Sequence, residues 1–61
     1  MLTKPQVTAM FEMDYLSYAR RLEDAEAIWS EFLFNLYMEK RISLKAYTTW
    51  LFPPHIEKKF K

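Results

Sequence analysis

The chain has 61 residues, and its nine basic and eight acidic side chains leave a formal net charge of +1. A chain of this length forms one domain at most and has little room for a catalytic pocket. Because it has no cysteine, no glycine and a single histidine, it offers no disulfide framework, phosphate-binding loop or metal site, and we expect a non-enzymatic protein without cofactor, metal or small-molecule substrate.

Hydrophobic residues make up 51% of the sequence and aromatic residues 18%. This content is high for a small domain, in which burial barely offsets the conformational entropy lost on folding. With disulfides and metals excluded, self-association or a partner protein remains as a source of stability. We therefore expect a homo-oligomer, with a dimer as the first choice, and aromatic side chains at its interface.

The location of the protein is predicted from what the sequence lacks. No apolar run approaches the roughly 18 residues that a membrane span requires, and the first residues show no secretory signal. Small secreted proteins usually contain disulfides. We expect a soluble, intracellular (cytoplasmic) protein with no membrane partner, and its size also suggests a viral or plasmid accessory protein.

The first predicted helix begins near Lys4. Thr3 and Gln6 have the spacing of a capping box, and Pro5 is tolerated in a first helical turn. From there apolar residues recur with alternating spacings of four and three, which indicates a heptad seam on one helical face. The seam consists of Val7, Phe11, Tyr15, Tyr18, Leu22, Ala25, Trp29, Phe32 and Leu36.

Two interpretations of the seam are open. In one, a single helix runs from Lys4 to Lys40 and is too long for the rest of the chain to cover. In the other, the helix breaks near Met13 and Asp14, where Asp14 is a suitable cap for a second helix. We prefer the break, which divides the seam between a short helix and a long one.

A last helix is predicted after the long one. Lys40 and Arg41 place cations at the end of the long helix, and Ser43 can cap the next one. This helix runs from Leu44 to Phe52 and ends before two consecutive prolines. Its apolar face, expected to fold back on the long helix, comprises Leu44, Tyr47 and Leu51, flanked by Ala46 and Trp50.

The predicted fold is therefore all-α, in a single helical domain of residues 1–61. It consists of a short N-terminal helix, one long amphipathic helix and a shorter C-terminal helix folded back as a hairpin or small three-helix bundle. Residues 53–61 form a short basic tail, which either frays or docks through Ile56 and Phe60.

Charge is unevenly distributed along the chain. Residues 12–31 carry six acids against two arginines, whereas residues 40–61 carry six cations against one glutamate. Solvated faces are one explanation, and head-to-tail pairing or a basic end for an anionic partner is the other. His55 has no cysteine or second histidine with which to form a metal site.

The leading functional prediction is a small regulatory protein that self-associates and binds a partner protein through its aromatic helical face. Large aromatic side chains contribute disproportionately to binding free energy. The predicted interface residues are Tyr18, Trp29, Phe32, Leu36 and Trp50.

A second prediction comes from the N-terminal third of the chain. Residues 2–14, followed by Tyr18-Ala19-Arg20-Arg21-Leu22, resemble the opening of excisionase-like and MerR-like helix-turn-helix proteins, although Glu12 stands where their turn usually has glycine. The resemblance implies a second helix in the DNA major groove, with Arg20 and Arg21 at phosphates or bases. The alternative function is a DNA-binding regulator that dimerises through the long helix. Its nucleic-acid contacts would be Arg20, Arg21, Lys40, Arg41 and Lys45.

Overall fold

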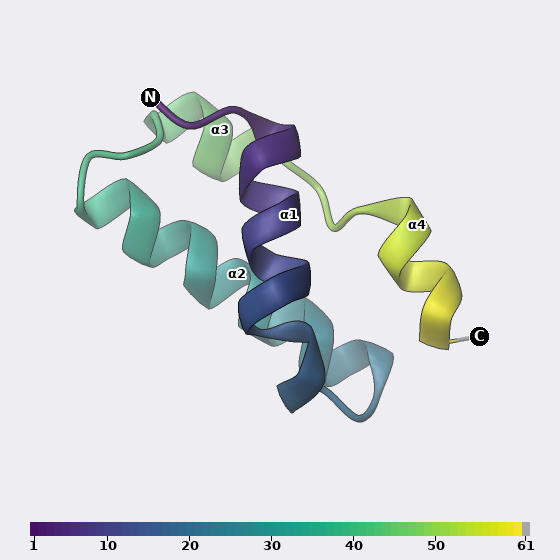
Figure 1. The fold of residues 1–61 in the computed structure, drawn as a ribbon. Helices are drawn as coiled ribbons and strands as arrows, with labels where there is room; N and C mark the ends of the chain where they lie inside the picture. Colours follow the sequence, from purple (N-terminus) through teal and green to yellow (C-terminus); the bar gives the residue numbers. More distant parts are fainter. Residues whose placement is uncertain (61) are drawn as a thin grey trace.

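The computed structural model describes residues 1–60, and in this range the chain is all-α with no strand. The helices are α1 (Lys4–Asp14), α2 (Leu22–Met38), α3 (Leu44–Thr49) and α4 (Pro54–Glu57), with 3-10 turns η1 (Leu16–Tyr18) and η2 (Lys58–Phe60). In Figure 1, α1 crosses α2, α3 lies near the N-terminus, and an extended segment leads to α4. The predicted all-α fold with one long helix and shorter ones is confirmed.

The start of α1 follows the predicted capping box. The Gln6 amide donates to Thr3 Oγ1 at 3.4 Å, and the Thr3 amide donates to Gln6 Oε1 at 2.9 Å. Both bonds satisfy backbone donors that have no partner within the helix. Pro5 stands in the first turn, where a missing N–H costs nothing.

The helix breaks after α1, as predicted, but Asp14 does not have the predicted role. Asp14 is the last residue of α1 and caps no second helix. The chain instead passes through η1, and α2 begins at Leu22 with Arg21 as an N-cap that makes no side-chain hydrogen bond. Glu23 and Asp24 occupy the first turn of α2, where carboxylates interact favourably with the helix dipole.

The end of α2 is a Schellman motif. The Arg41 amide donates to the Leu36 carbonyl at 2.9 Å, and the Lys40 amide donates to the Tyr37 carbonyl at 3.0 Å. Lys40 has φ 62°, the left-handed conformation that this motif requires and that glycine normally supplies. The helix therefore ends at Met38, slightly before the predicted Lys40.

Helix α3 begins as predicted but ends early. The Ala46 amide donates to Ser43 Oγ at 3.1 Å, which confirms the cap. The helix ends at Thr49 instead of Phe52, because Trp50 already has an extended ψ of 104°. The extended backbone leads into Pro53 and Pro54, which disfavour helical conformation in the residue before each of them.

The core forms where the predicted seam folds against itself. Its buried hydrophobic side chains are Val7, Phe11, Ala25, Trp29, Phe32, Leu33, Leu36, Ile42, Ala46 and Ile56. Phe11 meets Trp29 edge-on at 5.2 Å and Phe52 at 6.0 Å. The Trp29 indole N–H donates to the Trp50 carbonyl at 3.4 Å, so its polar atom is satisfied.

The C-terminal part departs most from the prediction. The apolar face predicted for the last helix is correct only in part, because Leu44 and Leu51 are exposed, whereas Ala46 is buried and Tyr47 and Trp50 pack against the core. The tail is docked, since Ile56 of α4 is fully buried and Phe60 packs against the core. Among the described residues, no helix has the length and apolar character needed to cross a membrane.

Candidate protein-interaction site

The structure separates the five predicted interface residues into two groups. Trp29, Phe32 and Leu36 lie in the core, and Trp50, the C-cap of α3, is half-buried and packs against the core. Tyr18 differs from these four, because 75% of its surface is exposed. Of the predicted set, Tyr18 alone presents most of its side chain to a partner.

A groove lies beside Tyr18 at the junction of η1 and α2. Its volume is about 420 Å³. We call it the tyrosine groove and define it by its lining residues, Tyr15, Tyr18, Ile28, Glu31, Phe32 and Asn35. Aromatic and aliphatic side chains with a few polar groups are typical of sites that bind another molecule.

Local sequence explains how the groove forms. The end of α1 leaves Tyr15 packed on Phe32, with ring centroids 4.7 Å apart. The Tyr18 amide donates to the Tyr15 carbonyl at 3.0 Å, which closes η1 and holds the two tyrosines three residues apart. On α2, Ile28 and Glu31 are three residues apart on one helical face and form the opposite wall.

A second depression continues from the tyrosine groove along α1 and α2. It has a volume of about 440 Å³ and shares three residues with the first, Tyr15, Phe32 and Asn35. The other residues that line it are Met10, Asp14, Leu36, Met38, Glu39 and Arg41. The two depressions therefore form one continuous surface along α1 and α2.

Three carboxylates and one guanidinium line the two depressions. Asp14, Glu31 and Glu39 line them, and Glu39 pairs with Arg41 at 3.9 Å. Within residues 1–60, neither Asp14 nor Glu31 forms an ion pair. Their charges remain available, and they favour a cationic group on whatever occupies the groove.

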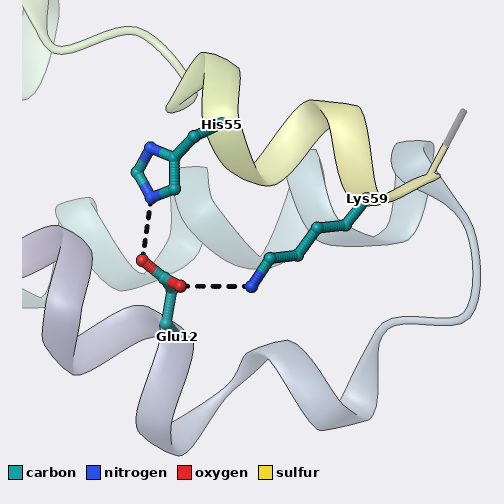
Figure 2. A network of polar contacts seen from close by, with 3 residues as sticks. All are labelled: Glu12, His55 and Lys59. Carbon is teal, nitrogen blue, oxygen red and sulfur yellow. Dashed lines mark hydrogen bonds and ion pairs between the residues drawn. The ribbon is translucent and has the colours of Figure 1, made fainter.

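A separate polar contact connects α1 to the C-terminal segment. Figure 2 shows the Glu12 carboxylate between His55 Nε2, at 2.8 Å, and Lys59 Nζ, at 3.3 Å. The hydrogen bond with His55 is the main cause of a lowered pKa for Glu12, burial opposes the shift, and Lys59 adds to it. Acidic and basic parts of the sequence thus pair within one chain, so this contact holds α4 against α1.

The predicted nucleic-acid contacts do not form one surface. Arg20 and Arg21 precede α2 instead of lying on a second helix, and Arg21 pairs with Glu23 at 3.2 Å. Lys40, Arg41 and Lys45 lie beyond the other end of α2, whose 17 residues span about 25 Å. The two cationic groups are therefore separated by the length of α2.

Sequence reasoning missed most of the groove. Ile28, Glu31 and Asn35 lie outside the heptad seam and were not among the predicted interface residues. The available signal was Ile28, an apolar side chain off the seam, with polar residues three and seven positions later on the same helical face. Within the described residues, no group of three or more acidic, histidine or cysteine side chains is placed to hold a metal ion.

Comparison with protein-family models, curated proteins and solved structures gives no match. The resemblance to helix-turn-helix proteins therefore gains no support from known families. A fold alone does not define a function, which depends on the chemistry of specific sites such as the tyrosine groove.

Proposed function

We propose that the protein is a non-enzymatic interaction protein that binds a segment of a partner protein in the tyrosine groove. The observation that carries the proposal is the exposed Tyr18 ring beside a hollow that is lined by the apolar Ile28 and Phe32 and by the carboxylate of Glu31. Tyrosine is enriched at binding hot spots because its ring contributes contact area while its hydroxyl forms hydrogen bonds.

The chemistry of the groove defines the segment it accepts. Ile28 and Phe32 offer apolar surface, so the partner needs an aliphatic or aromatic side chain that fills the hollow. Glu31 lies at the rim, and Asp14 lies in the adjoining depression. A lysine or arginine close to the apolar anchor would meet these carboxylates, which raises the association rate and disfavours acidic segments.

The proposal is tested by selecting binders from a random peptide library displayed on phage, with the whole chain as bait. We expect the enriched peptides to carry an apolar anchor within a few residues of lysine or arginine. Tyr18→Ala is expected to weaken the best peptide by tenfold or more, about 1.4 kcal/mol or more, as for a binding hot spot.

The matched control is Met13→Ala, which removes another exposed apolar side chain outside both depressions. It should leave peptide affinity unchanged. Enrichment of acidic peptides, or equal losses for Tyr18→Ala and Met13→Ala, would contradict the proposal.

A further inference from the structure

A second exposed apolar surface lies where α2 meets α3. Tyr47 of α3 stacks on Tyr37 of α2 at 5.6 Å and lies 5.9 Å from the Phe34 ring. Phe34 is 45% exposed, and Leu44, three residues before Tyr47 on α3, is 56% exposed. We call these four residues, Phe34, Tyr37, Leu44 and Tyr47, the α2–α3 patch.

The α2–α3 patch is flanked by cations. Lys45 follows Leu44 on α3, and Lys40 lies in the turn between the two helices. Both lysines are exposed, and neither forms an ion pair within residues 1–60. An apolar surface with neighbouring lysines suits the tyrosine groove, which offers the apolar side chains of Ile28 and Phe32 and the carboxylate of Glu31, unpaired in the described part of the chain, with Asp14 in the adjoining depression.

We propose that the α2–α3 patch of one copy occupies the tyrosine groove of a second copy. The inference rests on the proposed function of the groove and identifies a second copy of this chain as an occupant. Complementary charge is its basis, because Glu31 and Asp14 on one copy face Lys45 and Lys40 on the other. The small net charge of +1 leaves little overall repulsion between copies.

The contact joins two different surfaces. On α2, Asn35 of the groove and Phe34 of the patch are adjacent in sequence, so they point about 100° apart around the helix. Glu31 of the groove lies only three residues before Phe34, so the two surfaces are neighbours on α2. Copies that make the contact head-to-tail, each with a different neighbour, form an assembly that grows, whereas two copies that make it reciprocally, with each patch in the other's groove, close as a symmetric dimer.

The expected association is weak. The described chain exposes 4479 Å² in total, so a standard interface of about 800 Å² per partner would cover roughly a fifth of it. The groove is lined by six residues and the patch has four, fewer than the roughly 20–30 residues per side of a standard interface. Assembly should therefore appear at high protein concentration and reverse on dilution.

The test uses two variants, each lacking one half of the contact. Tyr18→Ala removes the exposed ring of the groove, whereas Leu44→Glu places a carboxylate in the patch, where it would face Glu31 of a neighbour. Neither should disturb folding, because Tyr18 and Leu44 are largely exposed and a glutamate in the first turn of α3 suits the helix dipole.

Sedimentation equilibrium over a wide concentration range gives the readout. The unchanged protein should increase in average mass with concentration, and each variant alone should associate at least tenfold more weakly. An equimolar mixture should recover association but stop at a dimer, because only the groove of Leu44→Glu and the patch of Tyr18→Ala can meet. Met13→Ala should behave as the unchanged protein.

Two outcomes would overturn the inference. If the unchanged protein associates and the mixture stays monomeric, the contact does not join these two surfaces. If the unchanged protein stays monomeric but still binds the selected basic peptide in a Tyr18-dependent way, only the second-copy inference fails. If the unchanged protein neither associates nor binds the selected peptide, the inference and the proposed function both fail.

Discussion

At the scale of single residues, side chains that occupy equivalent positions in the heptad seam differ widely in solvent exposure. Trp29 and Tyr18 both belong to the heptad seam, yet Trp29 is 4% exposed and Tyr18 is 75% exposed. The difference arises because Tyr18 ends a 3-10 turn at the corner of the fold, whereas Trp29 lies mid-helix opposite Phe11. Because the chain reverses direction at η1, the Tyr18 side chain stays outside the core and remains exposed.

Glu12 is a residue whose protonation state should be visible in stability. Its pKa is lowered in the folded chain, mainly by the hydrogen bond with His55. A carboxyl with a lowered folded pKa stabilises the fold above its unfolded pKa of about 4.3, and the contribution disappears as pH falls through the folded value. We expect Glu12→Gln to destabilise the protein by about 0.5–1 kcal/mol at neutral pH and by less near pH 3.

Urea unfolding at the two pH values measures this difference. The control is Glu31→Gln, because Glu31 forms no ion pair within residues 1–60, and its effect should stay within about 0.5 kcal/mol. A deficit for Glu12→Gln that does not shrink in acid would mean that the negative charge of Glu12 does not stabilise the fold through the contacts in Figure 2.

At the scale of elements, local signals located the two starts that have a side-chain cap, and failed at the start of α2 and the end of α3. The caps at Thr3 and Ser43 were predicted because each depends on a side chain and an amide three residues away. The end of α3 and the long connection before α2 depend on which residues reach the core, a tertiary effect. Propensity and spacing alone therefore did not reveal η1 or the early end at Thr49.

The C-terminus of α2 provides a test of backbone conformation. Lys40 holds φ 62°, which costs a residue with a Cβ about 1–2 kcal/mol. Glycine removes that cost but adds about 0.4–1 kcal/mol of entropy in the unfolded chain. Lys40→Gly should therefore stabilise the protein by about 0.5–1 kcal/mol, measured as a higher denaturation midpoint.

Lys40→Ala is the matched control, because it removes the same charge and keeps the Cβ. It should change stability by less than about 0.5 kcal/mol. If both variants shift stability equally, the effect belongs to the lysine charge and not to the left-handed backbone.

At the scale of the whole molecule, one chain reversal determines which surface the seam packs against. A straight helix would have presented all nine seam residues to another chain. Because the chain turns between α1 and α2, the two halves of the seam pack on each other, and Phe11 contacts Trp29 and Phe32 inside one chain. Six of the nine seam residues are buried in the core, but their spacing could not show that their partners lie in the same chain.

The same reversal defines what remains for binding. It leaves Tyr15 and Tyr18 at the corner with Ile28 and Glu31 of α2 opposite them, which forms the groove. No residue spacing within one helix encodes this arrangement, because its two walls come from different elements. The sequence predicted Tyr18 as an interface residue, and that assignment remains a prediction.

The central claim is that a partner binds in the tyrosine groove, and not at the buried part of the seam around Phe11 and Trp29. The most direct measurement is a two-dimensional NMR titration of the isotope-labelled chain with the best selected basic peptide. We predict that shifted resonances concentrate at Tyr15, Tyr18, Ile28, Glu31 and Asn35, while the Trp29 indole signal and the amides of α4 stay in place. Shifts centred on Trp29 and Phe11, with loss of the folded dispersion, would show that a partner opens the core and would contradict the account.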